Sequence, residues 1–388
     1  NVTNFENINL TTGLNGTITV PNFSVNSLTF GANMAGAGIL NYNAGTDNAL
    51  NLSTFTGNTS LTVNVAGTAT TDAVALTVGS TTAGNTFGAV PVVFNGAETV
   101  NLLSQGGANT FGGAFTLTQT AANQSLVITG SQNLTFTGAV GADAIDASAF
   151  TGILSLNGGT GAVATSITGG SGNDVLIGST VGDIINGGSG NDTITNAITG
   201  TAASAADQIT TGDGNDTVIL HGDTASGAVS TILNATSFIS DFTVGTSVAA
   251  SDFLGLSATV GNYANAGAFY AGVAVGAAGS AGLAIQSIAQ NAPAAGVAAT
   301  TDILKLTTGV ATAGTLQAAF NTAIGTATVT GFTAGDDIFF TLYDTTNSRM
   351  LVGVVDSTNG TNTQVETGDT VSLVGSISMS ATDYAAFS

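Results

Sequence analysis

Aspartate recurs at a fixed spacing between residues 160 and 219, in a chain that has few charged side chains. In successive nine-residue blocks the sixth position carries Asp174, Asp183, Asp192, Asp207 and Asp216. The positions before each aspartate are mostly Gly, Ser and Asn, which favour tight turns and cannot fill a core. A carboxylate beside the carbonyl oxygens of such a turn makes an all-oxygen site, and this chemistry suits a hard cation such as Ca²⁺.

An aliphatic residue stands at the eighth position of every block. These residues are Ile167, Leu176, Ile185, Ile194, Ile209 and Val218, once the insertion at 196–201 is set aside. We therefore expect a turn followed by a short strand, with position eight in a core and position six in the turn. Because two blocks make one coil of a parallel β-helix, aspartates two blocks apart share an edge. One edge carries Asp174, Asp192 and Asp216, and the other carries Asp183 and Asp207.

The turn residues of the glycine-rich blocks complete the predicted metal ligands. With Asp174, Asp192 and Asp216 they are Gly169, Gly170, Ser171, Gly172, Asn173, Gly187, Gly188, Ser189, Gly190, Asn191, Asp213, Gly214 and Asn215. One turn does not supply the six to eight oxygens that Ca²⁺ prefers, so each of several ions is expected between stacked turns. Without the ions the aligned carboxylates repel one another, and we expect this segment to fold only when Ca²⁺ binds.

Some blocks depart from the pattern. Block 178–186 lacks the second glycine, Ala205 and Ala206 replace the Gly-Asn pair before Asp207, and Thr165 replaces aspartate. The sites at Asp183 and Asp207 are accordingly less complete, and block 160–168 is expected to cap the stack without metal. The alternative for the whole segment is a set of glycine-rich turns that aspartate caps without any metal.

Composition limits the function classes. The chain has 388 residues, of which 43% are hydrophobic and 6% charged, and its net charge is -21. This balance excludes nucleic-acid binding through a basic patch, and no apolar run is long enough to predict a transmembrane segment. The absence of cysteine excludes disulfides and thiolate metal sites. Because the only histidine is His221 and neither HExxH nor GxSxG occurs, we expect no enzyme activity and a structural role for His221.

The chain is predicted to be all-β, with three parts. Residues 1–159 alternate short β-like runs with turns and are expected to form a solenoid-like or repeated β-domain, with a β-sandwich as the alternative. Residues 160–219 are expected to form a parallel β-roll or β-helix, a solenoid that binds Ca²⁺. Residues 220–388 are expected to form a β-rich domain with short helical inserts. Helical spacing occurs at 247–256, 281–290 and 313–325, and a hairpin is expected around TTNSR, between 337–344 and 350–357.

Further aspartates sit beside glycine or in turns. Each could be an additional Ca²⁺ ligand or simply a residue that forms a turn or caps a strand. They are Asp47, Asp143, Asp146, Asp336 and Asp337.

Residues 169–195 and 211–219 resemble the nonapeptide repeats of the repeats-in-toxin (RTX) family, whose members are exported by type I secretion. FTAGDDIFF at 332–340 and the tail DYAAFS at 383–388 are similar to the secretion-target domain of that family. The resemblance implies an uncleaved C-terminal export signal and the type I secretion machinery as a partner. It also implies passage through the cytosol unfolded and folding outside the cell in Ca²⁺.

The Ala/Thr/Gly/Asn-rich β composition, the scarcity of lysine and the repeats together most resemble surface-layer proteins of Gram-negative bacteria, of the Caulobacter type. This resemblance implies a secreted structural protein that assembles with its own copies into a two-dimensional lattice on the cell surface. The chain would be the C-terminal, lattice-forming part, and a region before Asn1 would bind lipopolysaccharide. The alternatives are a secreted adhesin or biofilm-matrix protein, and the export domain of an enzyme whose catalytic part lies upstream.

Overall fold

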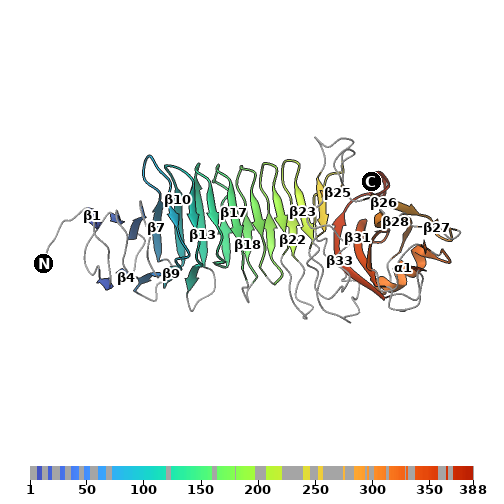
Figure 1. The fold of residues 1–388 in the computed structure, drawn as a ribbon, viewed down its shortest axis with the longest axis horizontal. Helices are drawn as coiled ribbons and strands as arrows, with labels where there is room; N and C mark the ends of the chain where they lie inside the picture. The colour runs from blue at the N-terminus through green and yellow to red at the C-terminus, as the bar shows by residue number, and fades with distance from the viewer. Residues whose placement is uncertain are drawn as a thin grey trace. The chain divides into compact units, whose positions relative to one another are not determined.

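The computed structural model places the residues that it describes mostly in β-strands, with two short helices, so the all-β prediction is confirmed (Figure 1). The chain separates into two compact units, Asn1–Thr193 and Ile194–Ser388, and each is considered by itself. The residues described are 7–10, 16–19, 27–30, 36–42, 48–52, 60–66, 72–118, 124–159, 164–179, 181–196, 207–220, 239–244, 252–256, 274–275, 284–292, 295–296, 301–311, 314–327, 329–330, 337–356, 364–365 and 370–387.

The first unit consists of short strands. They are β1 (Asn7–Leu10), β2 (Gly16–Thr19), β3 (Ser27–Phe30), β4 (Ala37–Tyr42), β5 (Asn48–Leu52), β6 (Ser60–Val65), β7 (Ala73–Val78), β8 (Thr86–Phe87), β9 (Val92–Asn95), β10 (Thr99–Ser104), β11 (Asn109–Phe111), β12 (Phe115–Thr118), β13 (Ser125–Gly130), β14 (Leu134–Phe136), β15 (Val140–Gly141), β16 (Ala144–Asp146), β17 (Leu154–Asn157), β18 (Ser166–Thr168), β19 (Val175–Ile177) and β20 (Ile184–Asn186). The next strand, β21 (Thr193–Thr195), begins at the end of this unit.

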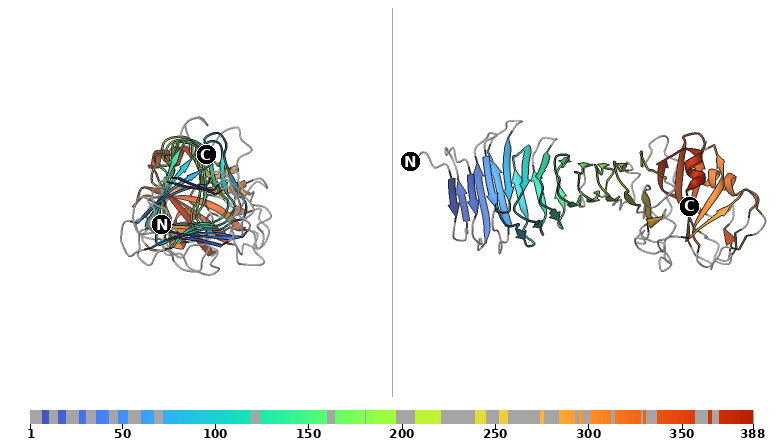
Figure 2. Two further views of the ribbon diagram at one scale, coloured as in Figure 1. Left: turned by 90° about the vertical axis from the view of Figure 1, so that its left-hand side faces the viewer. Right: turned by 90° about the horizontal axis from the view of Figure 1, so that it is seen from above.

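Consecutive strands of the first unit belong to different sheets. One sheet has the order β1-β3-β5-β7-β10-β13-β16-β18-β20, a second β15-β12-β9-β6-β4-β2, and a third β19-β17-β14-β11-β8. Neighbouring strands pair in parallel, as Figure 2 shows for the strands of this unit. The chain therefore passes from sheet to sheet and returns beside its earlier strand, as parallel pairing requires.

The core of the first unit consists of columns of equivalent residues on neighbouring strands. In the first sheet the register aligns Val74, Val100, Leu126, Ile145, Ile167 and Ile185, all of them buried. In the third sheet Phe87, Phe111 and Phe136 form a stack with ring centroids 4.4 and 5.1 Å apart. The prediction that position eight of each nonapeptide faces a core is confirmed, since each of its residues is buried.

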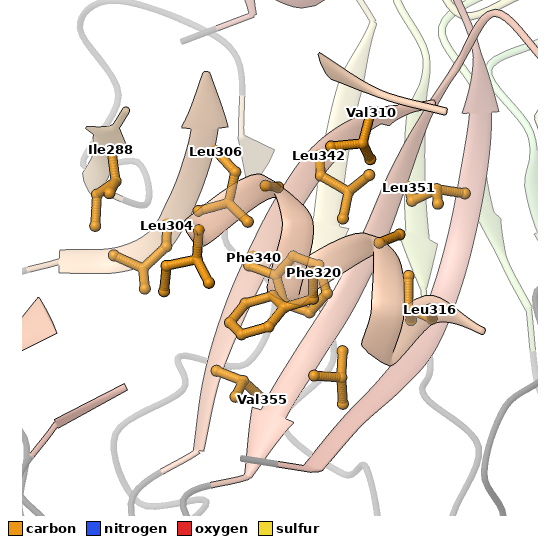
Figure 3. Close-up of a cluster of buried hydrophobic side chains, with 14 of the residues drawn as sticks. Ile288, Leu304, Leu306, Val310, Leu316, Phe320, Phe340, Leu342, Leu351 and Val355 are labelled. Atoms are coloured by element: carbon orange, nitrogen blue, oxygen red, sulfur yellow. The ribbon is translucent and has the colours of Figure 1, made fainter. Parts of the chain in front are cut away.

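The second unit combines further parallel strands with an antiparallel sheet. Its elements are β22 (Gln208–Thr210), β23 (Thr217–Leu220), β24 (Phe253–Leu256), β25 (Ala274–Val275), β26 (Ala284–Ile288), β27 (Ala295–Gly296), β28 (Thr301–Val310), α1 (Leu316–Ile324), β29 (Val329–Thr330), β30 (Asp337–Asp344), β31 (Arg349–Asp356), β32 (Gln364–Val365), β33 (Thr370–Ser378) and α2 (Ala381–Ala386). The main sheet has the order β26-β28-β30-β31-β33. Helix α1 packs on it through Phe320, whose ring lies 4.9 Å from that of Phe340 (Figure 3).

The predicted helix at 313–325 and the hairpin around TTNSR are confirmed, by α1 and by the antiparallel pair β30 and β31. The helices predicted at 247–256 and 281–290 are wrong, because the described parts of these segments are the strands β24 and β26. β24 pairs in parallel with β23, which sets Leu254 opposite Val218. Short apolar runs are compatible with a strand or a helix, and here pairing with a neighbouring strand favours the strand.

Candidate functional site

Asp174 ends the turn 169–174 and directly precedes β19. Its side chain is buried, and its two carboxylate oxygens accept separate backbone hydrogen bonds. The N–H of Leu154 donates to Oδ1 at 2.8 Å, and the N–H of Gly170 donates to Oδ2 at 2.7 Å. The carboxylate thus joins its own turn to strand β17, which neighbours β19.

Asp192, 18 residues later, accepts the equivalent backbone hydrogen bond through Oδ1. The N–H of Asp174 donates to Oδ1 of Asp192 at 2.7 Å, and the N–H of Thr193 donates to the carbonyl of Asp174 at 2.8 Å. The structure therefore brings Asp174 and Asp192 together on one edge, as the nine-residue register predicts.

Asp183 occupies the equivalent position before β20, in a different sheet from Asp174. Its Oδ1 accepts from the N–H of Thr165 at 2.7 Å and from the hydroxyl of Ser179 at 2.9 Å. Its Oδ2 accepts from the N–H of Ser179 at 2.5 Å. Asp183 thus lies beside a different sheet from Asp174, as predicted. Ser179 stands where the repeat has its second glycine, and its hydroxyl donates to the carboxylate of Asp183.

In the second unit Asp207 and Asp216 are also buried. The N–H of Asp216 donates to Oδ1 of Asp252 at 3.0 Å, and Oδ2 of Asp252 accepts from the N–H of Thr243 at 2.7 Å. Asp252 is a residue that the sequence analysis missed. The signal was present, because a block at 247–255 puts Asp252 at position six and Leu254 at position eight.

Asp241, also missed, caps the turn that leads to Asp216. Its Oδ1 accepts from the N–H and hydroxyl of Thr211, and its Oδ2 accepts from the N–H of Gly212 at 2.9 Å. Of the additional candidates, Asp143 accepts from the N–H of Gln124, and Asp146 accepts from the N–H of Ser148. Asp337 opens β30, whereas Asp47, Asp336 and His221 lie outside the described residues.

The glycines of the turns allow the backbones of successive turns to touch. Gly188 and Gly190 have φ angles of 102° and 120°, which disfavour side chains. A Cβ on Gly188 would lie 2.3 Å from the carbonyl oxygen of Gly170, and one on Gly190 would lie 2.2 Å from that of Gly172. Positions two and four of the repeat therefore need glycine for close stacking.

The other predicted turn ligands take part in this stacking. Asn173 accepts from the N–H of Asn191 at 2.8 Å through Oδ1, and the N–H of Ser189 donates to the carbonyl of Gly170 at 2.9 Å. In the second unit Gly212 and Gly214 have φ angles of 97° and 146° and continue the same turn chemistry before Asp216.

The aspartates carry buried negative charge. Burial raises the pKa of Asp174 and of Asp183, while the hydrogen bonds from backbone N–H groups oppose this shift. Burial likewise raises the pKa of Asp252, with a smaller contribution from the charge of Asp241. Each carboxylate would be stabilised by a nearby positive charge.

The two basic side chains of the chain are engaged with other groups. The ammonium of Lys305 donates to the carbonyl oxygens of Ala385 and Phe387 at 2.9 and 2.5 Å. Arg349 forms a buried ion pair with Asp344, with Nε 3.0 Å from Oδ2. With only two Lys and Arg residues in the sequence, the protein supplies no further guanidinium or ammonium for the repeat aspartates.

The donor set of the turns suits a hard cation. It consists of carboxylate and carbonyl oxygens, and each carboxylate keeps lone pairs beyond those used by its N–H donors. Among the described residues no three His, Cys, Asp or Glu side chains gather into a metal-binding group. Any ion bound here would therefore complete its shell with backbone carbonyls.

Comparisons of the chain with protein-family models, with curated proteins and with solved structures find no match. In the part of the chain that the structure describes, no helix has the length and apolar character needed to cross a membrane.

Proposed function

We propose that this chain is a structural protein of the RTX type that binds several Ca²⁺ ions, and that its parallel strands form a β-roll. The observation that carries the proposal is the row of buried, glycine-flanked carboxylates, in a sequence that has only two Lys and Arg residues. Asp174 and Asp192 would hold an ion together with carbonyl oxygens of the turns 169–173 and 187–191. Asp216 would do so with the turn 211–215.

The charge balance supports a bound cation. An ionised carboxylate is costly to bury unless it is paired or bound to metal, and hydrogen bonds offset only part of this cost. Asp174, Asp183 and Asp192 are each only 1% exposed. A divalent ion would neutralise the carboxylates and cross-link successive turns, and in this way it would couple binding to folding.

A second candidate is a row of aspartate caps that needs no metal. It is favoured by the hydrogen bonds of Asp174, both of whose oxygens already accept from backbone N–H groups. In that case the aspartates would act as side-chain caps for the turns, and the stability of the repeats would not depend on Ca²⁺.

For the whole protein we propose export by type I secretion and assembly of its copies into a two-dimensional surface-layer lattice ordered by Ca²⁺. The regular Thr- and Asn-rich strands and the acidic composition support this proposal. A secreted adhesin or matrix protein is the second candidate for the same Ca²⁺-dependent fold. No catalytic role is proposed for any residue.

Titration of the chelator-treated protein with Ca²⁺ tests both the proposed Ca²⁺ binding and the proposed assembly into a lattice. We expect a gain in β-structure by circular dichroism, several ions bound by calorimetry, and ordered sheets by electron microscopy. Mg²⁺ serves as the control, because irregular carbonyl-rich sites do not meet its octahedral demand. No binding and no change in circular dichroism would favour the metal-free caps. Binding that gives only monomers or irregular aggregates would exclude the lattice.

A further inference from the structure

Asn109 and Asp174 stand at the same level of two strands of one sheet, with two further strands between them. Asn109 lies in β11, and Asp174 directly precedes β19, which follows β14 and β17 in the sheet order. In each case the side chain accepts a backbone hydrogen bond from the equivalent residue of the preceding strand. The N–H of Asn85 donates to Oδ1 of Asn109 at 2.7 Å, just as the N–H of Leu154 donates to Asp174.

The second polar atom distinguishes the two side chains. Nδ2 of Asn109 donates to the hydroxyl of Ser104 at 2.9 Å and to the carbonyls of Gln105 and Gly107 at 3.2 and 3.0 Å. The second oxygen of Asp174 cannot donate and instead accepts from Gly170. The amide of Asn109 thus supplies its own turn with the positive partial charge that an aspartate turn lacks.

Asn109 is as deeply buried as Asp174, with 1% of its surface exposed, but it brings no charge into the core. Its turn, Ser104 to Asn109, also stacks closely on the preceding one. A Cβ on Gly106 would lie 1.9 Å from the carbonyl oxygen of Ser80. The same kind of tight, glycine-containing turn is therefore completed here by protein atoms alone.

We propose that the amide of Asn109 takes the place of a bound cation, and that Asn or Asp at this level of the sheet determines which turns bind Ca²⁺. This inference rests on the proposed function. It implies that residues 72–118 fold without Ca²⁺ and offer a preformed sheet edge on which the aspartate turns order when the ion binds.

The test is Asn109→Asp in the full chain, with Asn109→Ala and Asn133→Asp as controls. We expect Asn109→Asp to bind one more Ca²⁺ ion than wild type by calorimetry and to melt at a lower temperature only in chelator. Asn109→Ala should lose stability equally with and without Ca²⁺. Asn133→Asp should bind no extra ion, because Asn133 is exposed and its neighbour Leu134 takes the core position. If Ca²⁺ does not restore the stability of Asn109→Asp and the number of bound ions stays at the wild-type value, the inference is wrong.

Hydrogen exchange of the wild-type protein is a second test that needs no variant. In chelator we expect amides of 104–111 to remain protected and those of 169–177 to lose protection at least tenfold. Loss of protection in both segments would overturn the inference while leaving the Ca²⁺ function intact. Full protection of both segments would overturn the Ca²⁺ function itself, and the inference with it.

Discussion

The turns before β11 and β19 meet the same backbone requirement with different side chains. Each presents a buried oxygen to an N–H of the preceding strand, at 2.7 Å for Asn109 and 2.8 Å for Asp174. The asparagine also satisfies its own turn, whereas the aspartate leaves a buried charge. On the proposal made above, a neutral amide makes a turn self-sufficient, while a carboxylate makes it dependent on an external cation.

The two regions also differ in the length of their strands. In the first sheet β7, β10 and β13 have 6 residues each, while β18 and β20 have 3 each. In the third sheet β11 and β19 both have 3 residues. The asparagine region also contains the phenylalanine stack, whereas the aspartate region buries single aliphatic residues such as Leu176. Because less apolar surface is buried per strand, hydrophobic burial stabilises the repeats less.

The largest effect is expected from Phe111→Ala. Phe111 contacts Phe87, Phe115 and Phe136, so its removal leaves a cavity that should lower the free energy of unfolding by about 3–5 kcal/mol. The loss should be the same in Ca²⁺ and in chelator, as measured by urea unfolding followed by fluorescence or circular dichroism. Thr110→Ala, on the outward face of the same strand, is the control. If Ca²⁺ restored the stability of Phe111→Ala, the asparagine region would depend on Ca²⁺ as well, and the proposed difference between the two regions would be wrong.

Arg349→Met should have a similar effect in the second unit. It leaves Asp344 buried without its ion-pair partner, which costs about 3–5 kcal/mol. Thermal unfolding should show this loss at any Ca²⁺ concentration, because the hydrogen bonds that Asp344 accepts from Thr346 and Asn347 supply no full positive charge. Restoration by Ca²⁺ would mean that the ion also serves carboxylates outside the repeats.

Much of the repeat geometry could be predicted from the sequence, because it depends on local spacing. The aliphatic column, the two edges of aspartates and the hairpin before Arg349 all follow from short-range patterns. The strand at 253–256 fits the same pattern in a block at 247–255, but a long segment separates this block from the last repeat, and its pairing with β23 does not follow from local spacing. Asn109 was missed for a related reason. Its turn lacks the glycine pattern of the repeats, and only the register of the sheet aligns it with Asp174.

Gly190→Ala should have an intermediate effect in the repeats. A φ of 120° and the contact with the carbonyl of Gly172 make alanine unfavourable, by about 1–3 kcal/mol. We expect a weaker apparent affinity for Ca²⁺ by calorimetry, because the turn must order around the ion. Gly88→Ala is the matched control, since a Cβ there has nothing within 4 Å. Equal effects of the two substitutions would argue against close stacking of the turns.

The smallest effect is expected from the titration of Lys305, whose ammonium donates to two backbone carbonyls. Burial lowers the pKa of its ammonium, so the charged form is less favourable in the folded state than in the unfolded chain. The second unit should therefore become slightly more stable as the pH rises through the lowered pKa toward about 10.4, the value for an unperturbed lysine. The melting temperature between about pH 8 and pH 9.5 measures this gain, below the range in which tyrosine ordinarily ionises.

Lys305→Met should flatten the dependence of the melting temperature on pH while lowering stability, because the bonds to Ala385 and Phe387 are lost. A profile that changes with Ca²⁺ would extend the dependence on Ca²⁺ beyond the aspartate turns.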